Sequence, residues 1–306
     1  MKMTSLWKIK IVIGLFYILM SYFIFAQGPN KEYRIEVIID TLQKTPYVRT
    51  DRREIRFVSP DGKILKTLPY KDWQDRLGIF ISPYFKCLIK AKDTPAEWIK
   101  DSLGQRERIK EARVEFTYIN ARGEEKWKKD FEIIYTLEET DEDDVRPYFF
   151  VFSRDGGRIV FVKNDTFISE WKYPSDIFVY DTLGNEITSV YKTYGIENSN
   201  SIEISPDGKI IGAEVFPPPE SLYQRATKHL LFLDVETGRT KLVKAEGEGW
   251  GGRFVLSSSP TPPKNGKIRL NWYPTGKNYV RKPGGGVKTK EVTFDELPND
   301  LSVLFK

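Results

Sequence analysis

A turn motif recurs along this chain at a nearly constant spacing. Ser153-Arg154-Asp155-Gly156 and Ser205-Pro206-Asp207-Gly208 begin 52 residues apart, and each lies between two short apolar segments. Ser82-Pro83 and Ser259-Pro260 occupy matching positions. A second turn precedes three of these motifs by 20 or 21 residues, with Gly62 before Ser82, Gly184 before Ser205 and Gly238 before Ser259. A strand-rich repeat of this length predicts an all-β fold, namely a β-propeller of four-stranded blades around an axis.

The clearest repeat unit contains four candidate strands. They are the runs Tyr148–Phe152, Arg158–Val162, Asp176–Tyr180 and Glu186–Val190. Asp- and Gly-containing turns separate the first pair and the last pair, as hairpins require. A longer polar connection separates the two pairs, so each unit has short turns at one end and a long connection at the other.

The first unit has one strand too few. Tyr33–Asp40, Glu54–Val58 and Lys63–Leu68 are its strand candidates, and none precedes Tyr33. The apolar run Leu301–Phe305 at the C-terminus has no partner in the last unit. We therefore expect this run to form a strand beside Tyr33–Asp40 and to close a ring of about five blades, which would remove exposed sheet edges.

An insertion stretches the second unit between its second and third strands, from Asp93 to Arg113. Asp93 or Thr94 can cap a helix, and Pro95 suits its first position. We predict a small helical insertion here, although Gly104 interrupts it.

The first 26 residues differ from the rest of the chain. Lys2, Lys8 and Lys10 accompany an apolar run of 16 residues, Ile11–Ala26, whereas a membrane span needs about 20. We predict a signal peptide over residues 1–26, a single propeller domain over 27–306, and a periplasmic or secreted location. An uncleaved membrane anchor is the alternative. The remaining 45 basic and 43 acidic residues are nearly balanced, which argues against a nucleic-acid partner.

The turn Ser205-Pro206-Asp207-Gly208-Lys209 follows an apolar strand, and Asp181-Thr182-Leu183-Gly184 has the Asp-x-x-Gly form of the second turn. This combination resembles the WD-repeat-like propeller units of the TolB family, and similar units occur in propellers attached to prolyl oligopeptidases. The resemblance is best over residues 147–243 and implies a fold, not a function. The chain has no room for six blades and an extra domain, so the resemblance does not imply a TolB-like role.

In a propeller the longer connections share one face, where ligands and partners usually bind. Here they contain aromatic residues and an arginine, the types that anchor interfaces. These residues are Trp98, Trp171, Tyr173, Tyr194, Tyr223, Arg225 and Trp250. Rings that cover blade ends or pack between blades would give the same pattern. We predict a module that binds a protein or peptide partner in the cell envelope, with a carbohydrate-binding propeller as the alternative.

The sequence contains no evident set of catalytic residues. His229 is the sole histidine, so a nucleophile–histidine site would depend on it alone. Five-bladed glycosidases need paired carboxylates, and Glu203 is the one acidic residue in the predicted inner strands. The run Asp141–Asp144 lacks the ligand spacing of a calcium site. We expect no enzyme activity, no cofactor and no metal, with a glycoside hydrolase as a less favoured alternative. The lone Cys87 lies in an apolar run and should be buried.

Overall fold

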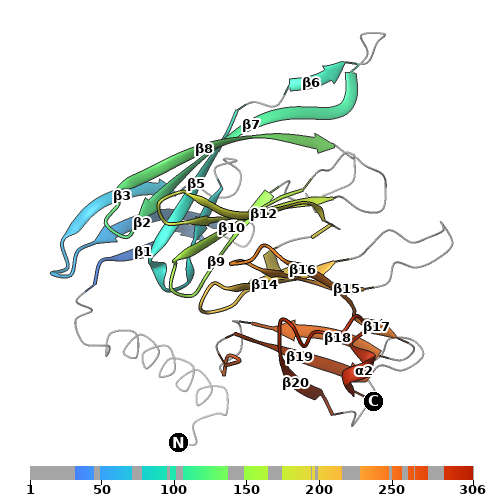
Figure 1. The fold of residues 1–306 in the computed structure, drawn as a ribbon. Coiled ribbons are helices and arrows are strands. Elements are labelled where there is room, and N and C mark those ends of the chain that lie inside the picture. The colour runs from blue at the N-terminus through green and yellow to red at the C-terminus, as the bar shows by residue number, and fades with distance from the viewer. Residues whose placement is uncertain are drawn as a thin grey trace, which may run out of the picture. The chain divides into compact units, whose positions relative to one another are not determined.

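The protein is all-β. The computed structural model describes residues 32–44, 49–70, 78–94, 97–100, 106–136, 148–164, 174–193, 195–196, 199–215, 228–247, 250–256, 261–264, 266–274 and 286–305. Its strands form five antiparallel sheets, of three, five, four, four and four strands in chain order (Figure 1). The chain divides into two compact units, residues 1–70 and 71–306.

The first unit contains the first sheet. Its strands are β1 (Arg34–Lys44), β2 (Arg49–Val58) and β3 (Ile64–Tyr70), in the order β1-β2-β3. The three strands predicted from the sequence are confirmed, and β1 and β2 are longer than predicted. Within the described part of the chain this sheet has no fourth strand.

The second sheet contains β4 (Ile79–Ile81), β5 (Cys87–Asp93), β6 (Glu97–Lys100), β7 (Arg106–Asn120) and β8 (Glu125–Thr136). A 3-10 turn, Pro83–Phe85, joins β4 to β5. The predicted helical insertion is wrong, because β6 pairs with the first half of β7 (Figure 1).

The third and fourth sheets are meanders in which each strand pairs with the next along the chain. The third contains β9 (Tyr148–Phe152), β10 (Arg158–Asn164), β11 (Ser175–Asp181) and β12 (Glu186–Thr193). A 3-10 turn, Ser199–Ser201, then leads into the fourth, which contains β13 (Ile202–Ile204), β14 (Ile210–Val215), β15 (His229–Asp234) and β16 (Thr240–Lys244). The predicted four-stranded units are confirmed here.

The fifth sheet contains β17 (Glu246–Gly247), β18 (Trp250–Val255), β19 (Lys267–Pro274) and β20 (Lys288–Thr293). It is followed by the helix α2 (Ser302–Phe305). The predicted closing strand at the C-terminus is therefore wrong. The Asp300 carboxylate accepts a hydrogen bond from the Ser302 N–H at 2.8 Å, as a helix cap does. Leu301 and Phe305 are buried, and their spacing of four residues places them on one face of a helical turn.

Alternate residues of the third sheet enter two different cores. Phe150 and Phe161 pack with residues of the second sheet, whereas Phe149 and Val160 pack with residues of the fourth. Side chains alternate between the two faces of a strand, so this sheet is covered on both faces. Another core joins the fourth and fifth sheets and includes Leu301 and Phe305. Apolar layers thus separate the second, third, fourth and fifth sheets in sequence, which is why their strands are apolar at consecutive positions.

Two further predictions concern single features of the chain. Cys87 is buried, as predicted, and burial raises the pKa of its thiol. The predicted signal peptide, residues 1–26, lies outside the described residues. No helix in the described part of the chain is long and apolar enough to span a membrane. A single propeller domain over 27–306 stays a prediction, but its predicted closure into a ring by a strand at Leu301–Phe305 is wrong, because Ser302–Phe305 is a helix.

Candidate functional site

The sheets of the second unit have two dissimilar ends. In the second, third and fourth sheets, short hairpin turns lie at one end, which we call the turn end; in the fifth sheet the connection at this end, residues 256–266, is longer. Long connections begin and end at the opposite strand ends, which we call the loop end. These connections are residues 165–174, 216–228 and 275–287, and the strands that bear them pair at Asn164↔Ser175, Val215↔His229 and Trp272↔Lys288. A connection carried on such paired strand ends is positioned by a rigid scaffold, which is where binding residues commonly lie.

A buried polar cluster holds the strand ends that bear the connection 165–174. The Ser175 hydroxyl donates to the Asn164 side-chain oxygen at 2.7 Å and accepts from the Ile196 N–H at 2.9 Å. All three residues are buried. Because an unpaired polar group would be costly here, these bonds fix the positions of β10, β11 and the segment after β12.

An ion pair holds the strand ends at the second connection. The Lys228 ammonium lies 2.8 Å from the Glu214 carboxylate, and both side chains are largely shielded from solvent. The Lys228 carbonyl also accepts a hydrogen bond from the Ala245 N–H at 3.0 Å. The start of β15 is therefore attached both to β14 and to the chain that follows β16.

Aromatic stacking stabilises the strand ends at the third connection. The rings of Trp272 and Phe305 stack with centroids 5.6 Å apart and planes 18° apart. The Lys288 ammonium donates to the Phe305 carbonyl at 2.7 Å. The C-terminal helix thus packs against the loop end of the fifth sheet and contacts both strands that bear the connection.

The turn end is held together by short-range hydrogen bonds. In the turn of the fourth sheet, the Ser205 hydroxyl donates to the Asp207 carboxylate at 2.6 Å and accepts from the Lys209 N–H at 3.1 Å. A matching bond joins Ser153 to Asp155 in the third sheet, and the hairpin of the first unit has the same bond between Ser59 and Asp61. The pKa of Asp155 lies below its ordinary value, because hydrogen bonds from Ser153 and Gly157 outweigh the opposing effect of burial. Each turn therefore satisfies its own polar groups.

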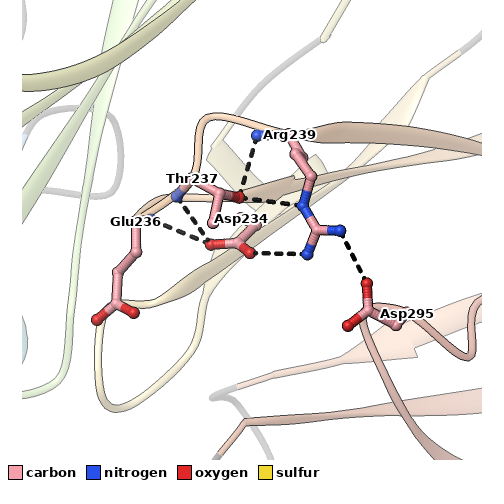
Figure 2. Close-up of polar contacts among 5 residues, drawn as sticks. All are labelled: Asp234, Glu236, Thr237, Arg239 and Asp295. Atoms are coloured by element: carbon pink, nitrogen blue, oxygen red, sulfur yellow. Dashed lines mark hydrogen bonds and ion pairs between the residues drawn. The ribbon is translucent and has the colours of Figure 1, made fainter.

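A charged network joins the turn end of the fourth sheet to the fifth (Figure 2). The Asp234 carboxylate accepts from the N–H groups of Glu236 and Thr237 at 3.1 and 3.3 Å. The Arg239 guanidinium contacts Asp234 at 3.4 Å and Asp295, beyond β20, at 2.9 Å. Arg239 pairs with both Asp234 and Asp295, so the arrangement supports a structural link between the two sheets.

The structure does not describe the side chains of the residues predicted to bind a partner, so it does not test whether they lie close together. Trp98 lies in β6 and Trp250 begins β18, but the placement of their side chains falls outside the description. The other five, Trp171, Tyr173, Tyr194, Tyr223 and Arg225, lie outside the described residues. Their convergence on one face stays a prediction.

The two residues considered for catalysis lie in strands. Glu203 lies in β13, and its carboxylate accepts a hydrogen bond from the Leu256 N–H at 2.8 Å. That bond joins the fourth sheet to the fifth. His229 begins β15 and pairs with Val215 and Lys244 across its two neighbouring strands. In the part of the chain that the structure describes, no three metal-ligating side chains cluster.

Sequence analysis missed two exposed aromatic residues at the turn end, Tyr84 and Phe85. They follow Ser82-Pro83, where two related turns have Asp-Gly: Ser59-Pro60-Asp61-Gly62 and Ser205-Pro206-Asp207-Gly208. The sequence did contain a signal for them, because comparison of the three turns shows Tyr84-Phe85 in place of Asp-Gly.

Comparison with protein-family models gave no match, and comparison with curated proteins gave none either. Among solved structures, the β-propeller domain of the Trilobed protease from Pyrococcus furiosus matches 85% of this chain over 81% of its own length, with 13% identity and a TM-score of 0.32. A variant of the Synechocystis apocarotenoid oxygenase matches 81% of this chain with 9% identity and a TM-score of 0.34, and the match spans 58% of that protein. Likenesses this distant carry no argument about activity.

Proposed function

We propose that this chain is an exported binding module of the β-propeller type, with TolB-like repeats, that binds a protein or peptide partner through its loop end. The observation that carries the proposal is the bracing of three long connections at their strand ends. A buried hydrogen-bonded cluster, a shielded ion pair and an aromatic stack hold these ends. Rigid strand ends that bear variable connections are a common way to build a recognition surface.

The composition of the connections supports the same function. Residues 165–174 contain Trp171 and Tyr173, and residues 216–228 contain Tyr223 and Arg225. Large rings and guanidinium groups contribute most of the energy of typical protein interfaces. The N-terminal apolar run, with its flanking lysines, supports export.

The test uses paired substitutions in the two connections. Trp171→Ala with Tyr173→Ala, and Tyr223→Ala with Arg225→Ala, should each weaken binding at least tenfold, as the loss of an interface anchor does. The partner is isolated first by pull-down from envelope extract with the immobilised wild-type protein, and its Kd is then measured for each variant. Leu183→Ala is the matched control, since Leu183 is an exposed apolar residue at the turn end.

The melting temperature of each variant decides between the outcomes. Unchanged melting with weakened binding supports the proposal. Unfolding of either double variant would show that these rings pack on the sheets. A folded variant that still binds would show that the loop end is not the recognition surface. A glycan array on the same proteins separates a protein partner from a carbohydrate, for which the same aromatic residues would serve.

A further inference from the structure

The turn between β4 and β5 exposes two large aromatic side chains. Tyr84 is 58% exposed and Phe85 is 47% exposed. The sequence is Ser82-Pro83-Tyr84-Phe85-Lys86, whereas the corresponding turn between β13 and β14 is Ser205-Pro206-Asp207-Gly208-Lys209. The two motifs differ only at their two central positions.

The aromatic pair adds no main-chain hydrogen bond to the turn that the Asp-Gly sequence lacks. The Phe85 N–H donates to the Ser82 carbonyl at 3.0 Å, as the Gly208 N–H does to the Ser205 carbonyl at 2.8 Å. The Ser82 hydroxyl accepts from the N–H of Cys87 at 2.9 Å. Ser205 accepts in the same way from Ile210 at 2.9 Å. The commoner sequence therefore makes the same main-chain bonds, but with a positive φ at Gly208 alone and not at Asp207.

The aromatic pair adopts an unfavourable backbone conformation. Tyr84 has a φ of 61° and Phe85 a φ of 57°, and no other non-glycine residue in the described part of the chain has a positive φ. Side chains of L-residues clash with the backbone in this region. Residues held in such conformations cluster at functional sites, where the strain accompanies a role. The turn therefore has a strained backbone at two residues whose exposed side chains are not needed for its main-chain hydrogen bonds.

One cation contacts a ring of the pair, and a second follows the pair in sequence. The Arg154 guanidinium lies 5.1 Å from the centre of the Tyr84 ring. Lys86 is exposed, and its Cβ would lie 3.5 Å from a Cβ added at Gly156, so the turns of the second and third sheets are adjacent. Within the described residues, no carboxylate forms an ion pair with Lys86 or Arg154. The nearby Asp155 carboxylate instead accepts from Ser153 and Gly157.

We propose that Tyr84, Phe85, Lys86 and Arg154 form a docking surface for an acidic segment of a partner protein, with an apolar side chain between its carboxylates. We call these four residues the aromatic turn patch. The rings supply apolar contact, and the two cations supply charge complementarity to carboxylates. The patch lies at the turn end, so it is separate from the loop-end surface of the proposed function.

The first test exchanges the turn sequences. Tyr84→Asp with Phe85→Gly gives the patch the sequence of the related turns, and it should raise the melting temperature by about 2–4 °C, a typical response to modest stabilisation in a chain of this size. The matched control is the reverse exchange, Asp61→Tyr with Gly62→Phe, at a turn where a Cβ on Gly62 would meet nothing within 4 Å. This control should lower the melting temperature. A lower melting temperature for the first variant would show that the aromatic pair stabilises the fold, and would overturn the proposal.

The second test measures binding directly. A displayed library of random 12-residue peptides is selected on the full chain and counter-selected on the Tyr84→Asp, Phe85→Gly variant. We expect enriched peptides to carry Asp or Glu on both sides of an apolar residue, to bind the variant at least tenfold more weakly, and to lose affinity as salt is raised. Enrichment of basic peptides, or of none that depends on the patch, would overturn the proposal. Patch-dependent binding to phosphatidylglycerol vesicles without peptide binding would also overturn it and assign the patch to a membrane surface.

Discussion

The turn end and the loop end of the second unit hold their strand ends in different ways. At the turn end the bonds are local, since Ser205 contacts the N–H groups of residues four and five positions later. At the loop end the partners are distant along the chain: Ile196 lies 21 positions after Ser175, and Phe305 lies 17 positions after Lys288. The turn motifs can therefore form from short segments, whereas the loop-end bonds form only when the strands have paired and the segments that follow them have packed back on their sheet.

This difference separates the two proposed surfaces. The loop end combines a rigid base with connections that vary in length and sequence, which suits recognition. The turn end repeats one hydrogen-bonded motif in several sheets, so a departure from that motif is conspicuous. The aromatic turn patch is such a departure, because it keeps the main-chain bond of the motif, has Tyr84 where the motif has the aspartate of its Ser–Asp bond, and exposes two aromatic side chains.

The largest effect should come from the aromatic stack at the loop end. Phe305→Ala removes a buried ring that stacks on Trp272, and we expect it to lower the free energy of unfolding by about 3–5 kcal/mol, as for other large truncations in a core. Urea denaturation measures the change. Val303→Ala is the matched control, because Val303 lies in the same helix and is 60% exposed. A loss of similar size in both variants would mean that the helix, not the ring, carries the stability.

A smaller effect should come from crowding at the turn end. A Cβ at Gly184, which has a φ of 85°, would lie 2.7 Å from the Trp127 ring. Gly184→Ala should therefore cost about 2–4 kcal/mol, from left-handed backbone and overpacking together. Gly62 has nearly the same φ but nothing within 4 Å, so Gly62→Ala should lose only the backbone contribution. Equal losses of unfolding free energy for the two variants, measured by urea denaturation, would contradict close packing of the Trp127 ring on the turn at Gly184.

The local character of the turn end explains what the sequence could predict. The Ser-Pro-Asp-Gly turns and the strands around them were predicted because their determinants lie within a few residues. The four-stranded third and fourth sheets followed from these turns. The loop-end contacts could not be predicted, because Ser175 gives no sign in the sequence of its bond to Ile196.

The two errors in the predicted fold have the same origin. Pro95 and its neighbours have local features of a helix start, but β6 pairs with β7 across the insertion. The run 301–305 was assigned as a strand from its apolar character and the missing strand in the first sheet. The spacing of Leu301 and Phe305 and the Asp300 cap were the local signals for a helix. In both places the sequence pattern did not reveal the interaction that determines the structure, which is strand pairing for β6 and packing in the core for residues 301–305.

The smallest effect should come from the charged network in Figure 2. Arg239 is 54% exposed and Asp295 75% exposed, so Arg239→Gln should lower the urea midpoint only slightly, and by less than either substitution above. Burial raises the pKa of Asp234, but its bonds to Thr237, Glu236 and Arg239 outweigh burial and hold the pKa below the ordinary value of 3.8. A lowered carboxyl pKa stabilises the fold above pH 3.8, and this contribution is lost as the pH falls through the lowered value. The difference between wild type and variant in urea midpoint should therefore be present at pH 7 and shrink below pH 3.8. A midpoint difference as large as that of Gly184→Ala, or one that grows on acidification, would contradict this prediction. It would show that the network stabilises the fold far more than an exposed ion pair does.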